Sequence, residues 1–230
     1  IRPTAVSTFH SIGLYWKPSG GSSSNVCRVR YREEGTTTWK QGYDLWFDSR
    51  TGYSWSNEYR GSLVNLKPGT TYMIELSLST GTIATFTAKT WSENFPIAKT
   101  VYLPESSSST LSISESGTEN GYILYTHPAG KTSTIDVNNN QDSCIDIQPN
   151  VHHVIIRGLT LKDARRHGIY LGDNTHDIVI EECDISNWGR VEPDGFGANQ
   201  DSAIRGGRGY SLVSNIERII IQRNRMHNPR

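Results

Sequence analysis

Apolar and polar residues alternate strictly in several short segments of residues 1–92. Ile12, Leu14 and Trp16 fall on one face of such a segment, because successive side chains of a β-strand point to opposite sides. The same period of two returns over residues 26–31 and 74–78, and sequences rich in Pro, Gly and acidic residues separate the segments. We predict about seven short strands here, a pattern typical of a β-sandwich.

The predicted sandwich resembles the fibronectin type III family. Trp16, Tyr31 and the pattern Leu-x-Pro-x-Thr-x-Tyr over residues 66–72 carry the resemblance. In that family the pattern is the tyrosine corner, in which the tyrosine hydroxyl bonds to nearby backbone. The resemblance implies a fold and no particular activity, because such modules serve as spacers, binders and packing partners.

Residues 43–60 are rich in aromatic side chains, which allow two interpretations. They could form a platform that stacks on sugar rings, or they could fill the core and pack against the second module. We favour the second interpretation, since aromatic residues pack well on strands. The aromatic residues are Tyr43, Trp46, Phe47, Tyr53, Trp55 and Tyr59.

A repeat begins near residue 143. Residues 150–161 align with residues 174–185, an offset of 174 − 150 = 24, and again with residues 215–226. A short strand is predicted just before each copy. Such a period is typical of solenoids, in which one coil cannot bury its apolar side alone and its neighbours supply the cover.

The aligned copies predict ladders of inward-facing side chains, one residue from each coil. Asn224 is the polar member of one ladder, and we expect it to require hydrogen-bond partners there. The predicted ladders are Val154/Ile178/Ile219, Ile156/Ile180/Ile221, Leu159/Cys183/Asn224 and Leu161/Ile185/Met226.

Residues 97–230 resemble the right-handed parallel β-helix superfamily. The segments that carry the resemblance are 167–171 (HGIYL), 177–189 (DIVIEECDISNWG) and 216–230 (IERIIIQRNRMHNPR). We therefore predict an all-β chain, with a fibronectin type III-like β-sandwich over 1–92 and the N-terminal rungs of a right-handed parallel β-helix over 93–230. Because the last predicted rung is apolar and lacks a polar cap, we expect the chain to be part of a longer protein.

The second resemblance implies a polysaccharide partner. Pectate lyases, alginate and glycosaminoglycan lyases, polygalacturonase-type hydrolases and phage tailspikes have this fold. We find no complete pectate-lyase or polygalacturonase signature. The resemblance implies a polysaccharide lyase or a glycoside hydrolase, and the alternatives are a surface adhesin, a tailspike-like stalk or a structural component of an extracellular assembly.

Composition narrows the function classes. Lys+Arg and Asp+Glu both number 23, and this zero net charge argues against a generic nucleic-acid binder, which usually carries a basic excess. No apolar run is long enough to span a membrane. Cys27, Cys144 and Cys183 fit no zinc motif and are predicted to be small buried residues. The abundance of Ser, Thr, Asn and Gly favours a secreted or cell-surface protein.

An insertion marks one corner of the predicted coils. The segment 186–202 replaces a much shorter turn at 162–167 in the preceding copy. Loops at one corner of a solenoid stack into one surface, which is often the binding face. We therefore expect arginines, histidines and carboxylates to converge along this edge.

Two chemistries could use this edge. A lyase acting on a uronic-acid polymer must neutralise the sugar carboxylate, as Arg165 or Arg166 could, and must remove the adjacent proton, as His167 could. A glycosidase needs two carboxyl groups. Asp194 and Asp201 are the principal catalytic candidates for that chemistry.

Further residues of the edge are candidates for binding and support. Glu192 and Asp184 are additional carboxylates. The predicted substrate-binding residues are Trp188, Glu192, Arg205 and His227.

The sequence contains no recognised metal-binding or cofactor-binding motif, and we predict neither a metal ligand set nor a cofactor from one. A calcium ion held near Asp194, Asn199 and Asp201 is an alternative, although the spacing is not that of an EF-hand. Glu181 and Glu182 are interpreted as alternating strand residues with opposed side chains.

Overall fold

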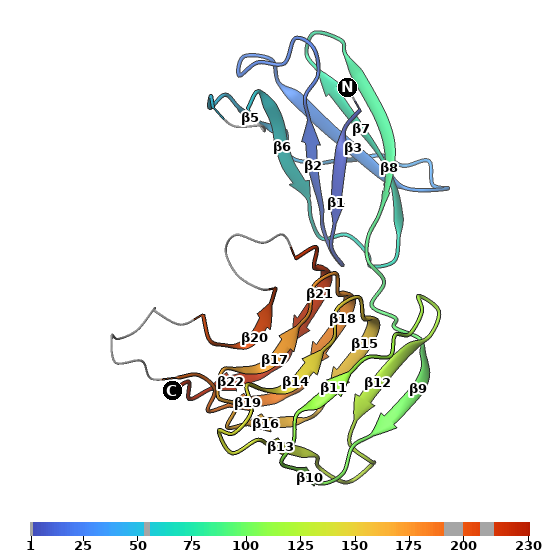
Figure 1. The fold of residues 1–230 in the computed structure, drawn as a ribbon. Helices are drawn as coiled ribbons and strands as arrows, with labels where there is room; N and C mark the ends of the chain where they lie inside the picture. The colour runs from blue at the N-terminus through green and yellow to red at the C-terminus, as the bar shows by residue number, and fades with distance from the viewer. Residues whose placement is uncertain (1, 53–55, 191–199, 208–213) are drawn as a thin grey trace. The chain divides into compact units, whose positions relative to one another are not determined.

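The computed structural model describes residues 2–52, 56–190, 200–207 and 214–230. Every regular element in these ranges is a β-strand, and the chain divides into two compact units, Ile1–Asn94 and Phe95–Arg230 (Figure 1). The described residues contain no helix long and apolar enough to cross a membrane. The predicted all-β fold class is confirmed.

The first unit contains two four-stranded antiparallel sheets. One has the order β1-β2-β6-β5 and the other the order β4-β3-β7-β8. The first sheet consists of β1 (Thr4–Ser7), β2 (Ile12–Trp16), β6 (Glu58–Leu63) and β5 (Trp46–Asp48). The second consists of β4 (Lys40–Gln41), β3 (Cys27–Glu33), β7 (Thr71–Leu78) and β8 (Ile83–Lys89). Alternate residues of β2 and β7 are buried, as the period of two predicts.

The pattern at 66–72 forms the expected local contact. Tyr72 is buried, and its hydroxyl oxygen accepts a hydrogen bond of 2.9 Å from the Lys67 backbone N–H. The predicted bond between this tyrosine and nearby backbone is confirmed. Membership of the fibronectin type III family stays a prediction.

The aromatic segment divides between core and surface. Tyr59 is buried and its ring packs edge-on against Phe47, with ring centroids 4.9 Å apart. Tyr43 and Trp46 are exposed, so the core-filling interpretation is wrong for these two residues. Tyr53 and Trp55 lie outside the described residues.

The second unit is a coil of three parallel sheets. Their strand orders are β21-β18-β15-β12-β9, β10-β13-β16-β19-β22 and β11-β14-β17-β20 (Figure 1). Each coil from β9 to β20 contributes one strand to each sheet, and the last described strands, β21 and β22, belong to two of the sheets. This is the architecture of a parallel β-helix; its right-handedness stays a prediction.

The coils begin before the sequence repeat. The early strands are β9 (Ile97–Tyr102), β10 (Ser106–Ser107), β11 (Leu111–Ile113), β12 (Tyr122–Thr126), β13 (Thr134–Asp136) and β14 (Ser143–Ile147). The strands of the repeat are β15 (His152–Arg157), β16 (Thr160–Lys162), β17 (His167–Leu171), β18 (His176–Glu181) and β19 (Asp184–Ser186). The last strands are β20 (Ser202–Gly206), β21 (Glu217–Gln222) and β22 (Arg225–His227).

The register of these sheets confirms the predicted ladders. Ile178 pairs with Val154 on one side and with Ile219 on the other, and Ile180 pairs likewise with Ile156 and Ile221. Leu161, Ile185 and Met226 are aligned in the adjacent sheet. The ladder side chains of the inner coils are fully buried, so stacking of coils supplies the core.

Asn224 has the partners that its position requires. Its side-chain oxygen accepts a 2.9 Å hydrogen bond from the Cys183 N–H, and its amide nitrogen donates a 2.8 Å bond to the Ile180 carbonyl. The amide thus replaces backbone bonds between coils. Cys144 and Cys183 are buried in the same core as predicted, and burial raises the pKa of the Cys144 thiol to about 12.

An asparagine ladder shapes the turns before β15, β18 and β21. Asn150, Asn174 and Asn215 all have left-handed backbone conformations, which Asn tolerates better than most residues. The Asn174 amide donates to Asn150, and the Asn215 amide donates to Asn174, both over 3.1 Å. The ladder makes the turns superimpose from coil to coil, so residues at equivalent positions form columns.

Candidate functional site at one corner of the coils

One corner of the β-helix gathers charged side chains from successive coils. It lies where β13, β16 and β19 lead into β14, β17 and β20. We call this group the arginine corner and define it by Asp142, Arg165, Arg166, His167, Arg190, Asp201 and Arg205.

Backbone hydrogen bonds stack the loops of this corner. The Arg165 N–H donates to the Gln141 carbonyl over 2.8 Å, and the N–H groups of Arg166 and His167 both donate to the Asp142 carbonyl. The Gly189 N–H donates to the Ala164 carbonyl of the preceding coil. The expected convergence of charged residues along one edge is therefore observed, although their functional roles stay predictions.

The side chains of the corner form an alternating chain of charges. Arg165 Nε donates to Asp142 over 2.7 Å, while Arg166 lies between Asp142, at 4.0 Å, and Asp201, at 3.5 Å. Asp201 accepts two bonds from the Arg190 guanidinium, of 2.9 and 3.1 Å, and a third from the Arg190 backbone N–H. Asp201 thus joins the two ends of the insertion to the coil before it.

The environment of Asp201 keeps it ionised. Burial by itself would raise the pKa of this carboxyl group, but the hydrogen bonds from Arg190 outweigh burial and hold the pKa below its usual range. A glycosidase acid must be protonated near neutral pH. Asp201 therefore suits a structural or electrostatic task better than that of a general acid.

His167 is a buried imidazole at the start of β17. Its side chain shares a face with Tyr170, and the two rings stack with centroids 5.9 Å apart and an interplanar angle of 27°. Burial, followed by the positive charge of Arg166, lowers the pKa of His167 to about 4. The imidazole is therefore neutral at pH 7 and can accept a proton, and its Nδ1 atom is buried without a hydrogen-bond partner.

A break in the strand alternation brings His167 and Tyr170 to the same face. Ile169 is in the core, and a Cβ atom added to Gly168 would clash with Ile185 Cγ2, so residue 168 faces inward as well. Two consecutive inward residues shift the alternation by one. The pattern of apolar residues alone could not locate this shift, because glycine has no side chain to report its direction.

The lowered pKa of His167 predicts a pH dependence of stability. The unfolded chain, with an ordinary histidine pKa of about 6.5, binds the proton that the folded chain rejects. The contribution of His167 is thus complete above about pH 6.5 and is lost as the pH falls toward 4, with a maximum of about 3 kcal/mol. We expect His167→Gln to show a flatter loss of stability than the parent between these pH values in urea unfolding. Parallel curves would contradict the buried neutral imidazole.

The remaining predicted site residues in the described part of the chain each have a different environment. Arg205 on β20 is in register with Tyr170, and its guanidinium donates to Gln200. Trp188 is partly buried against the β-helix core, which gives it a packing role. His227 contacts Asp184 at 2.9 Å on the neighbouring strands of the other sheet, and no contact in the described residues links it to Asp201.

Glu192 and Asp194 lie outside the described residues, as does Asn199. The predicted calcium site therefore has one described member, Asp201, whose oxygens accept hydrogen bonds from Arg190. Calcium binding stays a prediction.

The sequence did not reveal a buried carboxylate that lies between coils. Glu181 is buried on β18 and contacts Arg157 at 2.7 Å, Arg223 at 2.6 Å and Gln222 at 2.6 Å. The predicted opposition of Glu181 and Glu182 is wrong, because Glu182 also contacts Arg223, at 3.1 Å. Glu182 has a left-handed backbone, which ends the strand alternation at that residue.

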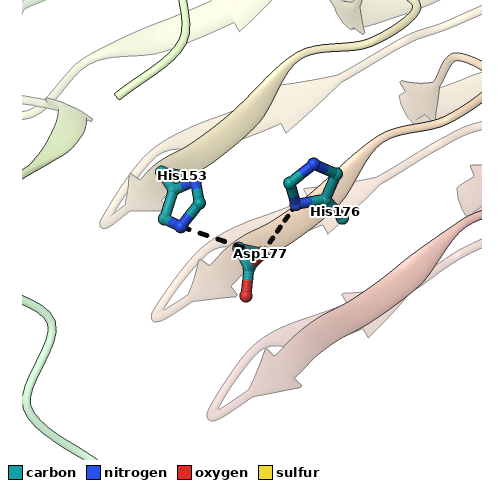
Figure 2. A group of neighbouring side chains, drawn as sticks. All are labelled: His153, His176 and Asp177. Atoms are coloured by element: carbon teal, nitrogen blue, oxygen red, sulfur yellow. Dashed lines mark hydrogen bonds and ion pairs between the residues drawn. The ribbon is translucent and has the colours of Figure 1, made fainter. Parts of the chain in front are cut away.

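A group of neighbouring histidine side chains was also not predicted from the sequence. We call His152, His153, His176 and Asp177 the histidine cluster. The Asp177 carboxylate lies between the His176 Nδ1 atom, at 2.6 Å, and the His153 Nε2 atom, at 3.8 Å (Figure 2). His153, His176 and Asp177 each offer a ligand atom within 4.8 Å of the other two. The aligned copies contained the signal, since the offset of 24 sets His152 beside His176 and His153 beside Asp177.

Comparisons with known proteins reveal only weak structural likeness. No protein-family model matches the chain, and no curated protein is similar to it in sequence. The sensor domain of the anti-sigma factor RsgI4 of Pseudobacteroides cellulosolvens has a TM-score of 0.30 and 16% identity, over 40% of this chain and 75% of that one. A shorter form of the same domain has a TM-score of 0.27 and 20% identity, over 40% and 92% of the two chains.

One likeness extends over most of the chain. The Family 28 exopolygalacturonase of Yersinia enterocolitica has a TM-score of 0.27 and 11% identity, over 98% of this chain and 74% of that one. These scores are too low to carry an argument about activity.

Proposed function

We propose that this chain belongs to a carbohydrate-active protein and binds an acidic polysaccharide, a polymer of uronic acids, along the arginine corner. The observation that supports the proposal is a surplus of positive charge among the described residues of this corner. Four guanidinium groups (Arg165, Arg166, Arg190 and Arg205) share the corner with two described carboxylates, Asp142 and Asp201. Guanidinium groups pair well with carboxylates, which each sugar of such a polymer carries.

The geometry of Arg166 supports the same proposal. Its Nε atom is buried and makes no hydrogen bond, although the nearest Asp201 oxygen is 3.5 Å away. The Arg166 side chain as a whole is 40% exposed, so the rest of its guanidinium can reach an anionic ligand that this buried N–H cannot reach. The sugar carboxylate is a ligand of that kind.

The finer proposal is eliminative cleavage of the bound polymer. Arg166 would neutralise the uronate carboxylate, and neutral His167 would take the proton from the adjacent carbon. The bond from the neighbouring carbon to the leaving glycosidic oxygen would break as a carbon–carbon double bond forms, and that oxygen would take up a proton from water. The positive charge of Arg166 lowers the pKa of His167. A bound carboxylate would offset that charge, and this would raise the pKa of His167 and make it a stronger base.

A second candidate is binding without cleavage. The burial of His167 and its pKa of about 4 make it a weak base in the free protein, and this favours an adhesin or a stalk that holds the polymer. In either case we propose a secreted or cell-surface location, with residues 1–92 as an accessory module resembling fibronectin type III and residues 93–230 as the binding module.

Replacement of Arg166 and Arg205 together tests the binding site. We expect the Arg166→Gln/Arg205→Gln variant to bind polygalacturonate at least about tenfold more weakly than the parent, because charge-assisted hydrogen bonds are each worth about 1.5–3 kcal/mol. Calorimetric titration at low salt measures the loss. Asp201 keeps Arg190 as its partner in this variant, so folding should persist.

The matched control is Arg225→Gln, at a well-exposed arginine of β22 outside the corner. It should bind like the parent. Equal loss in the control, or unchanged binding in the double variant, would contradict the proposed site. Near-ultraviolet absorbance of unsaturated products then separates a lyase from a protein that only binds.

A further inference from the structure

We propose that the histidine cluster is a binding site for a divalent transition metal such as Zn²⁺, with His153, His176 and Asp177 as ligands. The site is separate from the proposed polysaccharide site. It joins the first residues of β15 to the first residues of β18.

The donor set matches the chemistry of such metals. Imidazole nitrogen and carboxylate oxygen are common ligands of Zn²⁺, and two histidines with one carboxylate leave a fourth position for water. The three side chains are half-buried, so the site is accessible while its protein surroundings limit competition from water.

The distances fit a small metal ion. A tetrahedral Zn²⁺ with bonds of about 2.0–2.1 Å places neighbouring ligand atoms roughly 3.3 Å apart. The observed separations from the Asp177 oxygen, 2.6 Å to His176 Nδ1 and 3.8 Å to His153 Nε2, lie on either side of that value. Side-chain rotations that move each ligand atom by less than about 1 Å would bring all three into place.

His152 orients one of the ligands. Its Nδ1 atom lies 2.8 Å from His153 Nδ1, so one ring donates a hydrogen bond there and the other accepts it. When His153 donates, its Nε2 atom carries the free lone pair and faces Asp177. Metal-binding histidines are usually held in this way through the nitrogen that does not bind the metal. The His152 ring also stacks on His176 at 4.8 Å and restrains the second ligand.

The backbone places these residues together. His153 and Asp177 both have left-handed conformations, at equivalent positions of consecutive coils. Asn150 and Asn174, which are hydrogen-bonded to each other, each stand two residues before the first strand residue of their coil and set the same turn in both coils. The ligands are therefore held by a repeated turn rather than by a variable loop.

Arg218 competes for the same carboxylate. Its guanidinium bonds both oxygens of Asp177, at 2.8 and 2.7 Å, and lies 3.4 Å from His176 Nδ1. The arginine occupies the position of a cation beside the ligands. Glu217, which contacts Arg218 at 3.1 Å, offers the guanidinium another partner when a metal displaces it.

Cobalt and zinc titrations of the untagged, chelator-treated protein test the site. Co²⁺ should bind with a stoichiometry of one and develop the strong visible absorbance of a tetrahedral complex, and Zn²⁺ should displace it. Zn²⁺ at a hundredfold excess over its Kd should raise the melting temperature by about 5 °C or more.

Variants locate the bound metal. His176→Ala and Asp177→Asn should each weaken Zn²⁺ binding at least tenfold, while His127→Ala, a histidine of the same unit outside the cluster, should bind like the parent. Arg218→Ala should bind several-fold more tightly, because the competing cation is gone. Circular dichroism confirms that each variant is folded.

Three results would overturn the proposal. The first is no stoichiometric binding of either metal by the parent protein. The second is binding that survives in folded His176→Ala and Asp177→Asn. The third is equal or weaker binding in Arg218→Ala, which would show that the metal does not engage the Asp177 carboxylate.

Discussion

The Ile156→Ala variant is expected to lose about 3–5 kcal/mol of unfolding free energy, because truncation leaves a cavity in a close-packed core. Ile156 is fully buried on β15, the central strand of the sheet β21-β18-β15-β12-β9, between Tyr125 and Ile180 in register. Neighbouring coils pack against Ile156 on both sides, so the surrounding residues cannot easily move in to fill the cavity. Differential scanning calorimetry should show the loss in the transition of the second unit.

The same ladder provides the control. Ile221 occupies the equivalent position in the last coil, where it is 49% exposed. Ile221→Ala should cost less than about 1 kcal/mol, because little apolar surface is lost from the interior. A cost equal to that of Ile156→Ala would show that the last coil is covered in solution, and equally small costs would contradict the stacked core.

The Gly168→Ala variant is expected to lose about 3 kcal/mol, because the added methyl group overpacks the core. A Cβ atom at this position would clash with Ile185 Cγ2 and would lie 2.6 Å from the Ala203 carbonyl oxygen. The oxygen belongs to the adjacent strand and cannot rotate away as a side chain can, so β17 and β20 must separate. Urea unfolding measures the cost. Because His167 is the preceding residue, polysaccharide binding should weaken as well.

Gly206→Ala is the matched control on β20. Its added Cβ atom would meet the flexible end of Ile216 at 3.1 Å, and among the described residues it would meet no backbone atom within 4 Å. We expect a change of less than about 1 kcal/mol. A stable Gly168→Ala variant would mean that residue 168 does not face the core, and the shared face of His167 and Tyr170 would lose its explanation.

The insertion is more firmly attached to the coil than its length suggests. The sequence alone favours exchange of residues 188–201 for a short turn without loss of folding. In the structure Trp188 packs on the core and Asp201 binds Arg166 and Arg190. An exchange should therefore spare residues 188–190 and 200–201 and replace 191–199 only.

The sequence predicted the β-helix repeat from residue 143, although the coils begin at β9. The turns within residues 150–161 and within residues 174–185 have equal length, so the apolar positions of the two copies align directly. The earlier strands β11 and β12 belong to different sheets. Unequal connecting segments hide the period there, since a solenoid requires only that its strands stack.

The sequence by itself determined the ladder residues that face the core in the repeated coils, because burial of apolar side chains at matching positions is a local pattern that repeats. It also determined which corner would collect arginines, since the insertion is visible in the alignment of the copies. Only the tertiary structure decided the protonation of His167, the pairing of Asp201 with Arg190 and the meeting of His153 with Asp177. Those properties depend on distances across coils, on left-handed turns and on burial, all of which arise when chain segments distant in sequence stack together.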